Sequence, residues 1–333
     1  MIEITNKFLT GYTYVDLFCG IGGFHIALSS FGANCVFASD IDKYAQISYQ
    51  KNFGIQPSGD ITKIDTKDIP KHDILCAGFP CQPFSISGNQ QGFEDEQGRG
   101  RLFFNIVDII HAHHPKMVLL ENVKNLEKHD NGNTLKRIKV ELEKEGYTVF
   151  SKVLCAADYN IPQARQRIYI IAFRYDLEVN EFQFPLELND YKTLESVLIQ
   201  DSDNEISGNY YINREYKINC DIKEKTKKLV RIGQIGLGRQ GERIYSIKGF
   251  ATTLSSQGGG LGGKTGMYLI NGRVRKLYPR ECARLMGFPD SFILAQTQER
   301  CYNQFGNSVV VDVLQYIVNK TQEILEGKKD GTI

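Results

Sequence analysis

The chain has 333 residues, of which 41% are hydrophobic, enough for a substantial core and about two domains. No apolar run reaches the ~18 residues of a membrane span, and the N-terminus has no charged segment followed by an apolar one, so we expect a soluble cytoplasmic protein. The eight cysteines form no C-x-x-C pair, which predicts reduced thiols rather than disulfides or a zinc site.

The first half of the chain alternates short apolar runs with helical patterns. Helices are expected at residues 22–32, 101–114 and 132–146. Strands are expected at residues 13–18, 34–40, 72–79, 116–123 and 167–173. This alternation predicts an α/β fold, a Rossmann-like and mostly parallel sheet with helices on both faces.

The second half has a different character. Residues 231–272 contain twelve glycines, and we expect a smaller β- and loop-rich domain there. Residues 221–280 carry thirteen Lys or Arg against three acids, which fits either a polyanion partner or a solvated face. A helix is expected over 307–327, capped by Asn307 or Ser308 and packed back onto the first domain.

Two strand ends in the first half carry the features of a ligand site. The stretch "DLFCGIGGF" (16–24) places Gly20, Gly22 and Gly23 between a strand and a helix, and Asp40 ends the next strand. Glycines allow close backbone approach, and an acid about 20 residues on can accept both hydroxyls of a ribose. The turn lacks the G-x-G-x-x-G pattern that a dinucleotide-binding dehydrogenase requires, so the residues favour a nucleoside cofactor without a pyrophosphate.

Further polar residues lie at the ends of other strands. Cys81 in "GFPCQPFSIS" is either a small buried hydrophobe or a nucleophile, and Glu121 ends the run "LLENV". Arg165 and Arg167 precede a strand with i, i+2 spacing, which predicts that both project to one side. The histidines at 111, 113 and 114 are interpreted as a solvated helix end rather than a metal cluster.

These motifs occur together in a known order. The stretches "DLFCGIGGF", "GFPCQPFSISG", "ENVKNL", "QARQRIYIIAF", "RKLYPRECARLMGFPDSF" and "QFGNSVVVDVL" resemble the cytosine-5 DNA methyltransferases over essentially the whole chain. The basic, glycine-rich stretch is similar to the target-recognition segment of the Hha-type enzymes, whose site is GCGC. The resemblance implies a catalytic domain at 1–193 and 306–333, a target-recognition domain at 194–278 and a hinge at 279–305.

The resemblance also implies a mechanism. Cys81 would add to carbon 6 of a flipped cytosine, Glu121 would hold ring nitrogen 3 and the exocyclic amine, and Arg165, with Arg167 beside it, would position the ring oxygen. Carbon 5 would then take a methyl group from S-adenosylmethionine, without a metal. The cofactor-binding residues that it implies are Phe18, Gly20, Gly22, Gly23, Asp40, Ile41, Asp60, Ile61, Pro80, Asn307, Ser308 and Val309.

The same resemblance implies a set of DNA contacts. These are Ser85, Ser87, Gln240, Glu242, Arg243, Thr253 and Gly260, with residues 85–101 as a mobile lid. Two features depart from the family: Asp40 and Ile41 stand where Glu and Trp are common, which removes an aromatic partner of the adenine, and the lid is two residues longer.

The implied partners are double-stranded DNA and a cognate restriction endonuclease that acts on the same site without a stable complex. The enzyme itself is expected to be a monomer. An RNA (tRNA) cytosine-5 methyltransferase and a catalytically silent DNA-binding regulator are the alternatives. The Hha-like segment argues against the first, and the joint retention of Cys81, Glu121 and Arg165 argues against the second.

Overall fold

The computed structural model describes residues 4–79, 102–199, 210–220 and 222–327. The chain divides into two compact units, each built from separate stretches of sequence. The larger unit comprises Ile2–Leu154, Gln166–Leu186 and Leu314–Ile333. The smaller unit comprises Cys155–Arg165 and Glu187–Val313.

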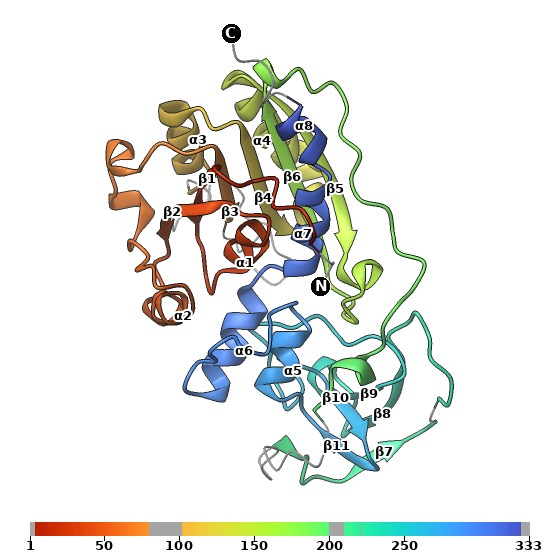
Figure 1. Cartoon of the computed structure of the whole chain (residues 1–333). Helices are drawn as coiled ribbons and strands as arrows, with labels where there is room; N and C mark the ends of the chain where they lie inside the picture. Colours follow the sequence, from red (N-terminus) through yellow and green to blue (C-terminus); the bar gives the residue numbers. More distant parts are fainter. Residues whose placement is uncertain (1–3, 80–101, 200–209, 221, 328–333) are drawn as a thin grey trace. The chain divides into compact units, whose positions relative to one another are not determined.

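The larger unit is a six-stranded sheet in the order β2-β1-β3-β4-β6-β5, with helices packed against it (Figure 1). Pairs β1–β2, β1–β3 and β3–β4 are parallel, whereas β6 runs antiparallel to β4. The strands are β1 Thr13–Leu17, β2 Asn34–Ser39, β3 Ile74–Gly78, β4 Met117–Val123, β5 Tyr147–Cys155 and β6 Gln166–Arg174. The helices are α1 Gly23–Ser30, α2 Lys43–Phe53, α3 Leu102–His113, α4 Asn133–Lys144, the end of α7 (Val311–Asn319) and α8 Gln322–Glu326.

Helices cover both faces of this sheet, as the continuous burial of successive residues along β1, β3 and β4 requires. Val15 and Leu17 of β1 share one apolar cluster with Ile106 of α3 and Ile138 of α4. Side chains of a strand alternate between its two faces, so Tyr14 and Asp16, which flank Val15, point to the opposite face. Tyr14 indeed lies against α1, with its hydroxyl 3.0 Å from the hydroxyl of Ser29. The predicted α/β fold is confirmed.

The strand order fixes where a ligand can bind. After β1 the chain forms β2 on one side of it and then crosses back to form β3 on its other side, so the strand order reverses at β1. In open α/β sheets, ligands bind outside the carboxyl ends of the strands at such a switch point. The carboxyl ends of β1, β2, β3 and β4 carry the glycine turn, Asp40, the segment leading to Cys81, and Glu121 respectively.

The smaller unit contains a five-stranded sheet in the order β11-β10-β9-β8-β7 over a small apolar core. Its elements are β7 Tyr216–Ile218, β8 Arg231–Ile235, β9 Arg243–Ser246, β10 Met267–Ile270, β11 Arg273–Arg275, α5 Pro279–Arg284 and α6 Gln298–Asn307. Arg275 and Glu281 form a fully buried ion pair with an N···O distance of 2.7 Å, which ties β11 to the first turn of α5. The expected β- and loop-rich character is confirmed.

The helix expected over 307–327 is wrong in its extent. Asn307 is the last residue of α6 and Ser308 is its C-cap, so neither begins a helix. Two further helices, α7 and α8, follow instead and are separated near Thr321. The expected return to the first domain is confirmed: Gln315 donates to Ser30 at 3.1 Å, and the Tyr12 hydroxyl donates to the carbonyl of Leu325.

The seven cysteines in the described ranges are free thiols, as predicted. No helix among the described residues is long and apolar enough to cross a bilayer. The compact units divide the chain at Leu154, Arg165, Leu186 and Val313, so the expected functional boundaries at 193/194, 278/279 and 305/306 stay a prediction.

Candidate active site

The glycine turn after β1 is held by a strand-end carboxylate. The amide of Gly20 donates to Oδ2 of Asp40 at 2.7 Å, and the amide of Asp42 donates to Oδ1 at 2.8 Å. Burial is the main cause that raises the pKa of Asp40, and these two backbone hydrogen bonds oppose it. Asp40, at the carboxyl end of β2, therefore holds the backbone of the glycine turn in place.

The backbone of the turn adopts conformations that favour glycine. Gly20 and Gly22 have φ of 54° and 88°, and Phe18 has φ of 53°, which is uncommon for a residue with a side chain. A Cβ at Gly22 would lie 2.2 Å from Cε2 of Phe53, whereas one at Gly20 would have nothing within 4 Å. Gly22 thus needs glycine for packing as well as for its φ, whereas Gly20 leaves open space above the backbone.

Asp60 and Ile41 lie in the loops next to the carboxyl end of β2. An isolated parallel bridge joins Ser39 to Ser58 and so brings the loop of Asp60 next to the end of β2. Asp60 caps a short 3₁₀ helix, Ile61–Lys63, and a hydrogen bond from the Thr62 hydroxyl at 2.8 Å is the main cause that lowers its pKa. Ile61 is buried, while Ile41 is 73% exposed.

These residues fit a nucleoside such as that of S-adenosylmethionine. A carboxylate can accept about four hydrogen bonds, and Asp40 accepts two from the backbone. Its remaining acceptor positions suit two ribose hydroxyls. Gly23 opens α1, whose first amides can bind a carboxylate.

The end of β3 is tied to β4 immediately before the predicted nucleophile. Gly78 pairs with Glu121 in the parallel ladder, and the side-chain amide of Asn122 donates to the carbonyl of Phe79 at 3.2 Å. Asn122 is itself held, because its side-chain oxygen accepts from the amide of Val123 at 2.8 Å. Sequence reasoning did not single out Asn122, although it directly follows Glu121 in "LLENV".

Four of the predicted site residues lie outside the described residues. They are Pro80, Cys81, Ser85 and Ser87, and the expected lid of residues 85–101 lies there as well. Their roles stay predictions.

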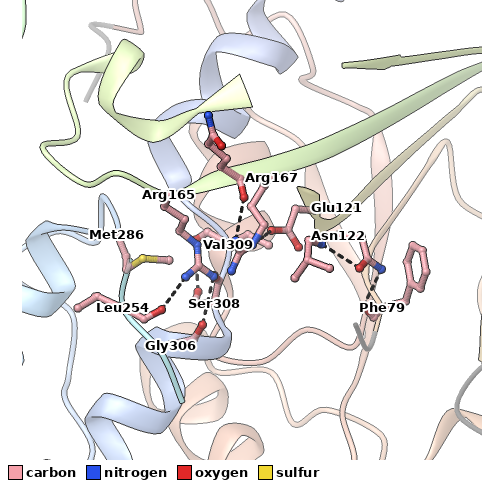
Figure 2. A network of polar contacts seen from close by, with 12 residues as sticks. Phe79, Glu121, Asn122, Arg165, Arg167, Leu254, Met286, Gly306, Ser308 and Val309 are labelled. Atoms are coloured by element: carbon pink, nitrogen blue, oxygen red, sulfur yellow. Dashed lines mark hydrogen bonds and ion pairs between the residues drawn. The ribbon is translucent and has the colours of Figure 1, made fainter. Parts of the chain in front are cut away.

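Glu121 contacts a guanidinium that comes from the neighbouring antiparallel strand. Nε of Arg167 lies 3.1 Å from Oε1 of Glu121, and the two side chains are 17% and 10% exposed (Figure 2). The ladder explains the contact, because Arg167, the second residue of β6, pairs with Val123, two residues beyond Glu121 on β4. The carboxylate is thus oriented at the carboxyl end of β4.

Arg165 has different partners from Arg167. Its Nη1 donates to the carbonyl of Leu254 at 3.0 Å, and its Nη2 donates to the carbonyls of Gly306 and Ser308 at 3.1 and 2.7 Å (Figure 2). The i, i+2 spacing predicted that both arginines project to one side. Arg165, however, precedes the first residue of β6, so the alternation of a strand does not govern it.

Arg165 lies within a larger set of contacts in the smaller unit. The side chain of Gln163 donates to the carbonyl of Leu285 at 2.7 Å and accepts from the amide of Leu254 at 2.9 Å. The hydroxyl of Thr253, a predicted DNA contact, donates to the carbonyl of Ala164 at 2.7 Å. Gln163 was missed by sequence reasoning, since its burial was not evident from a polar stretch.

The predicted cofactor residues at 307–309 belong to this smaller unit. Asn307 is exposed at the end of α6, whereas Ser308 and Val309 are buried. The carbonyl of Ser308 is one of the three that bind Arg165. The structure therefore describes the glycine turn and residues 307–309 in separate units.

The predicted DNA-reading residues gather between β8 and β9. Gln240 and Glu242 lie in a short 3₁₀ turn, Gln240–Glu242, and Arg243 begins β9. A carboxylate oxygen of Glu242 accepts from the amide of Arg239 at 2.9 Å. The glycine-rich segment packs onto this turn through its backbone, since the amide of Gly262 donates to the carbonyl of Gly241. A Cβ at Gly241 would lie 2.2 Å from the carbonyl oxygen of Gly259, so this contact requires glycine.

Comparison with known proteins agrees with this geometry. The family model for C-5 cytosine-specific DNA methylase matches residues 12–323. The type II methyltransferase M.HhaI of Haemophilus parahaemolyticus is 54% identical over 321 residues, which cover 95% of this chain and 96% of that protein. The type II methyltransferase M.HpaII of Haemophilus parainfluenzae is 40% identical and covers 94% of this chain and 90% of its own length.

Solved structures show the same fold at low sequence identity. The crystal structure of S. pombe Dnmt2 methyltransferase superposes with a TM-score of 0.69 at 22% identity, covering 95% of this chain and 99% of that one. The Entamoeba histolytica methyltransferase EhMeth superposes with a TM-score of 0.72 at 19% identity. Together with the glycine turn, Asp40 and the Glu121–Arg167 pair, the match over residues 12–323 shows that the chain belongs to the family of C-5 cytosine-specific DNA methylases, which use S-adenosylmethionine.

Proposed function

We propose that this DNA (cytosine-5-)-methyltransferase acts on the inner cytosine of GCGC in duplex DNA, as part of a restriction-modification system. Its similarity to M.HhaI over 95% of the chain supports the site, together with the basic recognition segment. The observation that carries the chemistry is the Arg167–Glu121 pair at the end of β4, next to the strand that leads toward Cys81.

The reaction needs a nucleophile because carbon 5 of cytosine is not reactive enough by itself. The Cys81 thiolate forms a bond to carbon 6, and the electron pair of the 5,6 double bond becomes available at carbon 5. S-adenosylmethionine would supply the methyl group as an electrophile: the bond from carbon 5 to the methyl carbon would form as the bond from that carbon to the sulfonium sulfur breaks, with S-adenosylhomocysteine as the leaving group. A base then removes the proton from carbon 5, and the returning electron pair restores the double bond and expels the Cys81 sulfur.

Glu121 and Arg167 hold the pyrimidine during this sequence. The carboxyl group of Glu121 contacts ring nitrogen 3 and the exocyclic amine. It supplies or shares a proton at nitrogen 3, and this proton offsets the negative charge that develops on the ring. Arg167 fixes one oxygen of this carboxylate at 3.1 Å. We assign the contact to the ring oxygen to Arg167 rather than Arg165, because the Nη atoms of Arg165 donate to three backbone carbonyls.

The cofactor contacts follow the edge of the larger sheet. Asp40 accepts the ribose hydroxyls, Asp60 accepts from the adenine amine, and the amides that open α1 face the methionine moiety. Phe18 and Ile61 supply apolar contacts, and the assignment of Asn307, Ser308 and Val309 to the cofactor stays a prediction from the resemblance. The exposed Ile41 offers an aliphatic surface to the adenine where the family commonly has an aromatic ring.

The target base is reached by flipping, which costs a few kcal/mol for a paired base. Ser87 and Gln240 fill the space that the base leaves. Glu242 and Arg243 read base edges in the major groove, and Ser85, Thr253 and Gly260 contact the backbone. The enzyme acts as a monomer in the cytosol, and its endonuclease partner recognises the same site without a stable complex.

Covalent trapping tests this proposal. With 5-fluorocytosine at the target position, carbon 5 carries no proton that a base can remove, so the Cys81 adduct cannot break down after methyl transfer. A denaturation-resistant complex should form with the GCGC duplex and S-adenosylmethionine, and the matched Cys81→Ser protein should not form it. An active preparation that never gives this adduct, or one that gives it only with RNA, contradicts the proposal.

A further inference from the structure

A solvent-exposed leucine lies in the turn of residues 235–238, which follows β8 and precedes the predicted DNA-contacting residues. Leu237 is 80% exposed and follows β8, three residues before Gln240. It is flanked by Gly236 and Gly238, which have φ of 49° and 70°. The amide of Gly238 donates to the carbonyl of Ile235 at 3.0 Å, so Leu237 occupies a tight turn and not a long loop.

The turn is braced by side chains from both neighbouring strands. The side-chain amide of Gln234 donates to the carbonyl of Gly236 at 3.1 Å, and Arg231 donates to the side-chain oxygen of Gln234. Nε of Arg243, from the opposite strand, donates to the carbonyl of Gly238 at 3.4 Å. The position of the leucine is therefore coupled to Arg243, the residue that we propose to read base edges.

The surroundings of Leu237 are cationic. Arg231, Arg239 and Arg243 lie within six residues of it, against one acid, Glu242, and the first two arginines are exposed. Clustered guanidiniums suit a polyanion, which points to DNA as the occupant of this face. Within the major groove, the apolar feature that a leucine can contact is the methyl group of thymine.

We propose that Leu237 contacts the thymine methyl of a base pair flanking the recognised tetranucleotide and so gives the enzyme a flanking-sequence preference. This inference rests on the proposed function, because it assumes methylation of a GCGC duplex. Burial of one methyl group against the leucine favours the preferred flank by about fourfold in kcat/KM. Phosphate contacts by Arg231 and Arg239 would not depend on this methyl group.

Thymine and uracil differ only by this methyl group, and the test uses that difference. GCGC duplexes are prepared with thymine or uracil at each of the two flanking positions on either side, on both strands. Initial rates of transfer from labelled S-adenosylmethionine give kcat/KM for each pair. We expect replacement of thymine by uracil in at least one flanking position to lower kcat/KM about fourfold for the unmodified protein.

Leu237→Ala should lose this difference and keep methylation at GCGC. Leu186→Ala is the matched control, because Leu186 is also 80% exposed but lies in the larger unit, and it should behave as the unmodified protein. Equal rates with thymine and uracil at every position, or a difference that persists in Leu237→Ala, overturn the inference. Absence of methylation in every GCGC duplex would instead contradict the proposed function.

Discussion

Substitutions at Arg165 and Arg167 should have different effects, the first mainly on stability and the second mainly on catalysis. Arg165 is 2% exposed and donates to three backbone carbonyls, so Arg165→Ala removes three charge-assisted hydrogen bonds and leaves a cavity. Each such bond contributes about 1.5–3 kcal/mol, but the three share one guanidinium and do not add. We expect a loss of about 3 kcal/mol in the free energy of unfolding, which lowers the melting temperature of a chain of this length by about 4 °C.

Arg167→Ala should have the opposite balance. Its side chain is 17% exposed and contacts the Glu121 carboxylate, so we expect about 1–2 kcal/mol of lost stability. Because Glu121 loses the group that orients it, kcat/KM should fall by about 100- to 1000-fold. Arg167→Lys keeps the charge but loses the planar guanidinium, and it should recover part of the activity.

The assay measures both quantities on the same preparations. Thermal unfolding is followed by calorimetry, and methyl transfer is followed with a GCGC duplex at a temperature where both variants are folded. Two results would refute the assignment: an Arg165→Ala protein that melts like the unmodified one, or an Arg167→Ala protein that keeps its kcat/KM. Equal loss of activity with unchanged stability in both variants would return the ring-oxygen contact to Arg165.

Two further predictions concern packing. Gly22→Ala places a methyl group 2.2 Å from Phe53 at φ 88°, so we expect it to cost about 2–5 kcal/mol and to weaken S-adenosylmethionine binding, measured by calorimetric titration. Gly20→Ala has open space around its Cβ and should cost only the ~1–2 kcal/mol of its positive φ; equal effects of both changes would contradict the packing argument. Glu281→Ala strands the buried guanidinium of Arg275 and should lower the free energy of unfolding by about 3–5 kcal/mol in denaturant titrations. The double change Arg275→Met with Glu281→Leu removes the stranded charge but leaves the amides of Ile199 and Tyr278 without the carboxylate that accepts from them, so it should restore only part of this loss. A single variant as stable as the unmodified protein would show that the ion pair is not needed.

The parallel strands could be predicted because they are buried on both faces and read as continuous apolar runs, as in "ILCAG" and "MVLLENV". The ligand edge followed from the glycine turn and the acids at strand ends. Helix α2, "KYAQISYQKNF", was not predicted, because it is mostly polar and buries few of its residues. The break after Asn307 was missed since "NSVVVDVL" has an apolar periodicity that continues across it.

The site was predictable at the level of residue types and less so at the level of partners. Glu121 was singled out because a buried acid needs a partner, but the sequence does not say which arginine it contacts. That choice depends on where β6 begins and on its antiparallel register with β4. Asn122 and Gln163 were missed because their roles are to hold backbone groups of distant segments, which no local pattern records.

The position of the transferred methyl group tests the central claim most directly. DNA from cells that express the protein is treated with bisulfite and sequenced, with cells carrying the Cys81→Ser form as the control. The account predicts protected cytosines at the inner position of GCGC on both strands and none in the control. Protection at another sequence would contradict the proposed site, and the absence of 5-methylcytosine from the DNA of cells that contain the folded protein would contradict the account as a whole.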